Sequence, residues 1–170
     1  MNANQNIINS FTMLQQTQYN ATSWIGHSNS DDKDIVSGQT FVSPKDCDLE
    51  AIEIFSSLVT NPGYVTMTLH QFDEQEKKWG PELKSTVVDF EKKDFEKWIA
   101  FHLNGIHLNK GKSYGFKLQS ADSFIGIGEA VSDNQQPVLH SGQEWQFTNG
   151  EKKGQPLNYF SLAFKVDIRA

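Results

Sequence analysis

The chain of 170 residues carries 21 acidic and 15 basic side chains, which give a net charge of −6 at pH 7 and an isoelectric point near 5.3. A nucleic-acid-binding domain presents a basic face and an isoelectric point above about 9, so this composition argues against a nucleic-acid partner. No apolar run approaches the about 18 residues that a membrane-spanning helix needs, so no membrane span is expected. The mean hydropathy is only −0.53, but twelve Phe, four Trp and four Tyr can fill the core of one domain.

The sequence leaves the cellular compartment open. Its single cysteine, Cys47, cannot form a disulfide within the chain, and a lone cysteine in a small domain is usually a buried, apolar residue. The first residues, MNANQNIINSF, lack the basic stretch followed by an apolar stretch that marks a signal peptide. Either the protein stays inside the cell, or Met1 replaces a leader that has been removed.

Residues 1–34 are polar, and we expect them to pack on the domain or to lead into it, whereas residues 35–170 are predicted to form the domain itself. Within the first segment, Trp24 and Ile25 interrupt the polar run and predict the start of a strand. Residues 35–44 then form an extended stretch that ends at a proline, because the residue before a proline is disfavoured in helical geometry.

The stretch LEAIEIFSSLV, which begins at Leu49 and covers residues 49–59, fits two patterns. Leu49, Ala51 and Phe55 follow the alternation of a strand, whereas Leu49, Ile52 and Val59 lie near helical spacing. We predict a strand, because β-branched and aromatic residues cluster here and the neighbouring segments are all β.

The rest of the chain alternates apolar and polar side chains at a period of two, with Asn, Gly and Pro at the breaks. The clearest alternation covers residues 95–118, and further strands are predicted at residues 64–72, 83–90, 124–128, 145–147 and 159–168. About nine or ten short strands separated by frequent turns predict an all-β fold, an antiparallel β-sandwich of the jelly-roll type.

The order of several motifs along the chain is similar to that of a known family. The motifs are Gln39-Thr40-Phe41, the strand YVTMTL with a loop ending in Gly80-Pro81, the strand from Trp98 to Leu103, Gly111-Lys112-Ser113-Tyr114, and the closing strand from Ser161 to Lys165. This layout resembles the jelly-roll accessory domains of bacterial surface and secreted proteins, which are similar to galactose-binding-like domains and carbohydrate-binding modules. The resemblance covers residues 35–168. It implies an exported protein of the extracellular space or periplasm, with a cytoplasmic location as the open alternative.

Carbohydrate-binding sites use exposed aromatic rings that stack on the apolar face of a sugar, with polar side chains that bond its hydroxyl groups. Trp79 is the main candidate, because it lies in a charged loop with no apolar periodicity to bury it. Trp24 and Trp145, each flanked by polar residues, are further candidates, and polar contacts near Trp145 are predicted from Tyr159, Asn158, His140 and Gln143. The alternative is that these rings close the ends of the sandwich. Trp98 lies inside a regular strand and is predicted to be a core residue.

Asp31, Asp32 and Asp34 form an acidic cluster of the kind that holds a structural calcium ion, which prefers several oxygen ligands. A solvated loop is the alternative, and no other cofactor is expected. The five histidines complete no zinc-binding pattern. Catalysis has no support, because no G-x-S-x-G motif is present and no pair of carboxylates stands out among the acidic residues.

Two hypotheses about function follow. The first is a non-catalytic carbohydrate-binding module that binds a glycan through aromatic residues in its loops. The second is a structural or protein-interaction β-sandwich of a surface assembly, in which the same aromatic rings contact another protein. The partner is therefore predicted to be either a carbohydrate or a protein.

Overall fold

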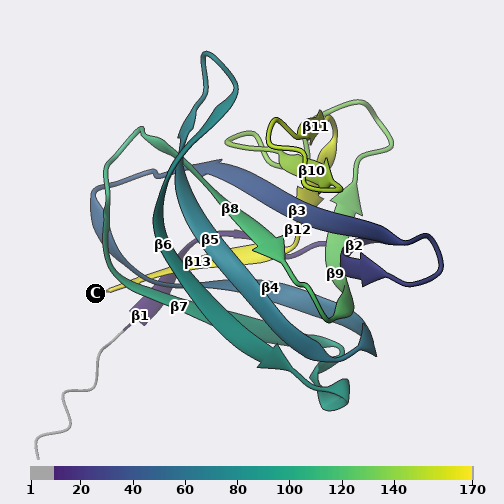
Figure 1. Ribbon diagram of the computed structural model, residues 1–170. Helices are drawn as coiled ribbons and strands as arrows, with labels where there is room; N and C mark the ends of the chain where they lie inside the picture. Colours follow the sequence, from purple (N-terminus) through teal and green to yellow (C-terminus); the bar gives the residue numbers. More distant parts are fainter. Residues whose placement is uncertain (1–9, 170) are drawn as a thin grey trace, which may run out of the picture.

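The computed structural model describes residues 10–169, which form thirteen strands and one short 3-10 helix (Figure 1). In chain order the elements are β1 (Ser10–Gln16), β2 (Ala21–Ser28), β3 (Lys33–Val42), β4 (Cys47–Asn61), β5 (Gly63–Asp73), β6 (Lys78–Phe90), η1 (Lys92–Asp94), β7 (Lys97–Leu108), β8 (Ser113–Gln119), β9 (Phe124–Val131), β10 (Glu144–Thr148), β11 (Gln155–Leu157), β12 (Phe160–Leu162) and β13 (Phe164–Arg169). Within this range no helix is both long enough and apolar enough to cross a membrane.

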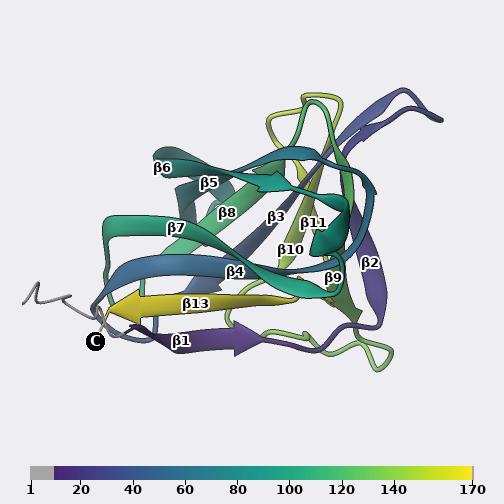
Figure 2. The same cartoon turned by 90° about the horizontal axis from the view of Figure 1, so that it is seen from below.

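The strands form one antiparallel ladder that curls back on itself. Hydrogen-bonded neighbours follow the order β1-β13-β4-β9-β2-β3-β8-β5-β6, with β7 beside β4, β12 beside β9, and β10 between β3 and β11. Figure 2 shows β6, β5, β8 and β3 in one layer over β7, β4, β13 and β1 in the other, with β9 and β2 joining the layers at one side. The predicted fold class, an all-β antiparallel sandwich, is confirmed.

Residues 10–34 take part in this ladder as β1 and β2. β1 pairs with β13, and its first residue, Ser10, lies opposite Arg169 near the other end of the chain. β2 is inserted between β9 and β3. Residues 1–9 of the expected N-terminal segment lie outside the described residues.

The stretch with two possible patterns is a strand, as predicted, and forms the central part of β4. The pairing of β4 with β7 contains a bulge between Leu49 and Ala51. A bulge inserts one extra residue and so changes which face the following side chains occupy. Leu49 and Ile52 therefore both point into the core, each with no exposed surface. The apparent helical spacing of these two residues is the effect of the bulge.

Aromatic side chains fill the space between the two layers. The ring of Phe164, from β13, lies 6.2 Å from the ring of Phe41 on β3 and 5.7 Å from the ring of Phe116 on β8. All three side chains are fully buried. Because each buried aromatic removes about 150–250 Å² from water, these contacts across the layers carry a large share of the stability.

Replacing Phe164 by alanine should lower the free energy of unfolding by about 3–5 kcal/mol, since it leaves a cavity between both layers. Urea denaturation followed by circular dichroism measures the loss. Phe95→Ala is the matched control, because the Phe95 side chain is 51% exposed and its removal should cost less than about 0.5 kcal/mol. Equal losses in the two variants would contradict this account of the core.

Candidate functional site

Trp79 lies in an aromatic cluster that is separate from the core between the layers. It is on β6, opposite Phe72 of β5, and the centroids of these two rings are 5.5 Å apart. Trp145 and Phe147, from β10, have ring centroids 6.0 and 5.7 Å from that of Trp79, and their planes are tilted 89° and 73° from it. Aromatic rings favour such edge-to-face contacts. The three neighbouring rings therefore hold the indole of Trp79 in one orientation.

Two glycines make room for the Trp79 ring on the outer surface of the sheet. Gly38 of β3 and Gly115 of β8 alternate with the core residues Phe41 and Phe116, so they face outward. A Cβ atom added to Gly115 would lie 2.5 Å from a ring carbon of Trp79, and one added to Gly38 would lie 3.0 Å away. The indole thus lies directly on the backbone of β3 and β8. Sequence analysis missed these glycines, although a glycine inside an alternating strand often marks such a close approach.

Two basic side chains border the aromatic cluster, and sequence analysis assigned neither of them a role. The Lys117 ammonium lies 5.0 Å from the centroid of the Trp79 ring and 4.3 Å from that of Phe147, and burial lowers the pKa of Lys117. The centroid of the His70 ring lies 5.7 Å from that of the Trp79 ring. Burial lowers the pKa of His70, so the imidazole is neutral at pH 7. The Nδ1–H of His70 donates to the carbonyl of Gly80 at 3.1 Å, which leaves Nε2 to accept from the Thr68 hydroxyl at 2.8 Å.

Trp79 lines a cavity of about 770 Å³ beside the β5–β6 hairpin. The opposite wall is the turn between β7 and β8. The lining of the cavity is mostly polar. Its polar members are Gln71, Asp73, Glu74, Gln75, Lys78, Asn109, Lys112 and Ser113, and its aromatic members are Phe72, Trp79 and Tyr114. Ligand-binding cavities commonly have volumes of about 300–1,000 Å³ and combine aromatic walls with a few polar groups. The cavity therefore suits a small polar ligand with one apolar face.

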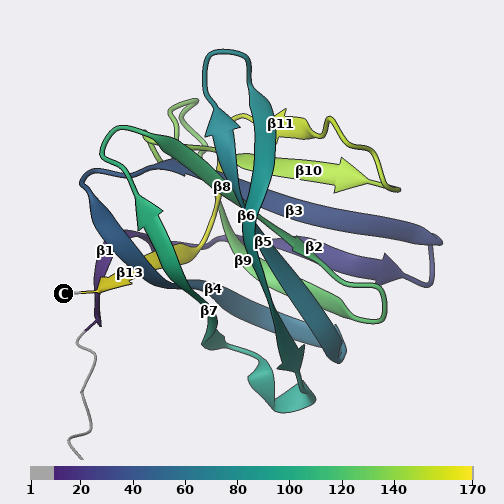
Figure 3. The same cartoon turned by 60° about the vertical axis from the view of Figure 1, so that its left-hand side comes forward.

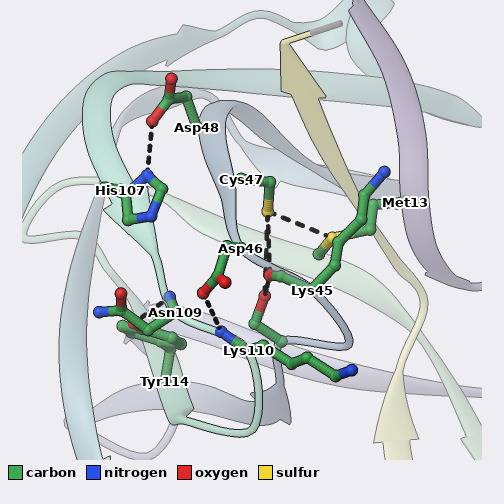
Figure 4. A network of polar contacts seen from close by, with 10 residues as sticks. Met13, Lys45, Asp46, Cys47, Asp48, His107, Asn109, Lys110 and Tyr114 are labelled. Carbon is green, nitrogen blue, oxygen red and sulfur yellow. Dashed lines mark hydrogen bonds and ion pairs between the residues drawn. The ribbon is translucent and has the colours of Figure 1, made fainter.

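The β7–β8 turn that closes this cavity is fixed by hydrogen bonds to its backbone (Figure 4). The N–H of Asn109 donates to the Tyr114 hydroxyl at 2.9 Å, and the N–H of Lys110 donates to a carboxylate oxygen of Asp46 at 2.8 Å. Cys47 lies next to this turn and is buried, as expected for a lone cysteine. Its Sγ contacts Met13 Sδ at 3.4 Å, and burial raises the pKa of the thiol.

A second cavity, of about 420 Å³, lies on the other side of the β5–β6 hairpin. It is lined by four residues that sequence analysis selected, His140, Gln143, Asn158 and Tyr159, and Glu74 lines both cavities. The side-chain amide of Gln143 donates to that of Asn158 at 3.5 Å. Figure 3 shows the hairpin standing between the β7–β8 turn on one side and β10 and β11 on the other. The structure therefore brings these predicted residues together with the Trp79 hairpin.

Three of the four tryptophans lie differently from the sequence-based expectation. Trp145 is only 2% exposed, so the hypothesis that its ring stacks on a sugar is wrong; the ring supports Trp79 instead. Trp24 lines neither cavity, and its ring stacks on that of Phe124 with the two ring centroids 4.8 Å apart. Trp98 is half-buried outside the core cluster, against Phe55 and under the Lys165 ammonium.

The residues of the acidic cluster, Asp31, Asp32 and Asp34, lie at the β2–β3 turn. No group of three or more His, Cys, Asp or Glu side chains within residues 10–169 is arranged to hold a metal ion. Asp32 and Asp34 instead face His27, at 3.6 and 2.8 Å from its ring nitrogens. The calcium prediction thus gains no support from the geometry of Asp31, Asp32 and Asp34.

Glu144 and Glu129 form a buried acid pair that sequence analysis did not anticipate. Their side chains are 0% and 6% exposed, and neither carboxylate oxygen of Glu144 has a donor partner in the described part of the chain. Burial, together with the neighbouring Glu129 carboxyl group, raises the pKa of Glu144 to about 11. Because a buried carboxyl group beside a second one disfavours the charged form, Glu144 carries a proton at pH 7.

This pair should make the protein less stable as the pH rises. The unfolded chain releases the Glu144 proton above about 4.5 whereas the folded chain keeps it, so the contribution of Glu144 to stability is greatest below that pH and is lost as the pH rises toward the folded pKa. Glu144→Gln, which cannot ionise, should be more stable than the wild type at pH 9 by several kcal/mol, since each pKa unit corresponds to about 1.4 kcal/mol.

Chemical denaturation from pH 5 to pH 9 tests this expectation. Glu76→Gln is the control for the loss of one charge, because the Glu76 side chain is exposed. An unchanged pH dependence in Glu144→Gln would show that Glu144 is not protonated in the folded protein.

Comparison with known proteins supports the fold and adds no family. No protein-family model matches the chain, and no curated protein matches it. A solved structure of the cysteine protease and lectin-like domains of Cwp84, a surface layer associated protein of Clostridium difficile, is 11% identical with a TM-score of 0.51 and covers 81% of this chain. Another structure of the Cwp84 cysteine protease, after propeptide cleavage, is 11% identical with a TM-score of 0.53 and covers 95%.

The chain spans only 32% and 40% of those two Cwp84 chains. A family 35 carbohydrate-binding module from Clostridium thermocellum is 14% identical with a TM-score of 0.38, over 71% of this chain and 95% of the module. At these identities the similarity shows the fold alone. The similarity to the two Cwp84 structures agrees with the expected fold, an antiparallel β-sandwich.

Proposed function

We propose that this protein is a non-catalytic carbohydrate-binding module of a bacterial exported protein, and that it binds a glycan against the ring of Trp79. The observation that carries this proposal is the position of Trp79, a partly exposed indole on the wall of a polar cavity of about 770 Å³. A sugar has an apolar face of C–H groups and a rim of hydroxyl groups. The ring meets the first requirement, and the amide and carboxylate side chains of the cavity meet the second.

The cavity is built before any ligand arrives. The Trp79 ring rests on Gly38 and Gly115 and is flanked by Phe72 and Phe147. Binding loses less conformational entropy when the contacting side chain already has a single orientation. A weakly binding, neutral sugar benefits most from such a rigid platform.

The carboxylates of the cavity support a binding role over a catalytic one. Asp73 accepts hydrogen bonds from the backbone N–H groups of Gln75 and Glu76, both at 3.0 Å, and Glu74 pairs with Lys77. Both acids thus stabilise the hairpin turn. Another carboxyl group with a raised pKa, Glu53 at about 7 because of burial and the neighbouring Asp167, lines neither cavity.

The second candidate function is a protein contact within a surface assembly. It is favoured by exposed apolar side chains around the β5–β6 pair, where Tyr64 is 59% and Val87 54% exposed. Tyr64 pairs with Asp89 and Val87 pairs with Thr66, two steps apart in the β5–β6 ladder and therefore on the same face of the sheet. This candidate requires association with another chain, which size-exclusion chromatography detects.

Trp79→Ala should weaken glycan binding by at least about tenfold, since it removes the stacking surface, a change of about 1.4 kcal/mol or more. A glycan array followed by tryptophan fluorescence titration of each hit makes the measurement. Gln71→Ala gives a second probe that leaves the aromatic cluster intact, and it should weaken binding several-fold because Gln71 lines the cavity.

The control is Trp98→Phe, which changes an indole outside both cavities and should leave the affinity unchanged. Circular dichroism establishes that each variant is folded. A folded wild-type protein that binds no glycan would refute the proposed function, and self-association in that protein would favour the protein-interaction candidate.

A further inference from the structure

We propose that the binding site continues over the β5–β6 hairpin into the second cavity, so that the ligand is an oligosaccharide chain and not a single sugar. This inference rests on the proposed function and names the length of its ligand. Its starting point is Glu74, which lines both the cavity of about 770 Å³ and the cavity of about 420 Å³. The two cavities are therefore neighbours, separated by one hairpin.

The second cavity has an aromatic ring of its own. Tyr159 is 42% exposed and lies in the turn between β11 and β12. Its backbone is in the left-handed region, with φ of +68°. A bulky side chain rarely adopts this conformation, and such strained residues concentrate at functional sites. The N–H of Ser132 donates to the Tyr159 carbonyl at 2.9 Å, which holds the turn in place.

Polar groups surround this ring in the same way as they surround Trp79. The side-chain amides of Gln143 and Asn158 meet at 3.5 Å, and His140 is exposed beside them. The strand β10 starts immediately after Gln143, whose backbone is fixed by hydrogen bonds in both directions with Thr40 at 3.0 and 3.1 Å. The second cavity thus repeats the combination of one exposed ring with amide groups on a fixed backbone.

The hairpin between the cavities is ordered enough to act as a shared wall. Its turn is held by the two backbone bonds to Asp73 and by the pair between Glu74 and Lys77. A chain of sugars that stacks on Trp79 at one side and on Tyr159 at the other passes Glu74, whose carboxylate accepts hydrogen bonds from hydroxyl groups. Once one end of the oligosaccharide is bound at Trp79, its binding in the second cavity is an intramolecular step. Such linked contacts raise the overall affinity without any change in the contacts at Trp79.

The test is a titration of neutral oligosaccharide ladders, from the monosaccharide to the hexasaccharide of the cello-, xylo-, manno- and N-acetylglucosamine series. We expect the affinity of the wild type for one of these series to rise by at least about tenfold from the shortest bound member to the longest. Tyr159→Asn should abolish this gain and change binding of the shortest member by less than about twofold. Asparagine removes the ring and tolerates the left-handed backbone, so the variant keeps the turn.

Tyr64→Asn is the matched control, because it removes an exposed tyrosine that lines neither cavity, and it should keep the full gain. Binding that depends on Trp79 but does not increase with ligand length overturns the extended site and leaves the proposed function standing. A length-dependent gain that survives Tyr159→Asn also overturns it. If no ladder binds to the folded wild type, the extended site is refuted, and the glycan array decides whether the proposed function falls with it.

Discussion

The contact of Phe164 with Phe41 and Phe116 between the layers is the interaction on which the rest of the structure depends. The strands form a single curled ladder whose layers are joined at one side by β9 and β2, and over the rest of the interface side-chain packing keeps the two layers face to face. Phe41 and Phe116 belong to β3 and β8, the same strands whose glycines carry Trp79 on their other side. Core packing on the inner face of β3 and β8 thus holds the backbone of these strands in place, and the Trp79 ring lies on the outer face of the same backbone.

The platform and its surroundings are organised around one projecting hairpin. β5 and β6 place Trp79 in the second pair from the hairpin turn and Glu74 in the turn itself, and the neighbouring turns supply the walls of the cavities. None of these turns contains a disulfide, since Cys47 is the single cysteine of the chain. They are held by backbone hydrogen bonds to Asp46, Asp73, Tyr114 and Ser132. A site of this kind is specified by turn geometry, which varies easily without disturbing the core beneath.

The sequence predicted the fold well, because alternation of apolar side chains is a direct result of strand geometry. It predicted the β4 region less clearly, since the bulge at Leu49–Ala51 imitates helical spacing. It also selected Trp79 and the residues that line the second cavity, whose part in binding stays a prediction, but it placed Trp79 in a loop whereas the structure places it on β6. It failed for Trp145, because polar neighbours in sequence do not show that another aromatic ring will cover it in space. The burial of Glu144 beside Glu129 was equally hidden, since the two residues come from separate strands.

The pairing of β1 with β13 has a mechanical consequence. Ser10 lies opposite Arg169, so both ends of the described chain lie at the same end of the β1–β13 pair (Figure 1). A force that pulls these two ends apart is perpendicular to the strands at the last residue pair of the β1–β13 ladder. The hydrogen bonds between β1 and β13 therefore break one after another. In a ladder sheared along its length, all bonds would share the load. Under tension, therefore, β1 peels from the sheet at low force while the layers beneath keep their packing, which gives the domain an extensible end beside a rigid sandwich.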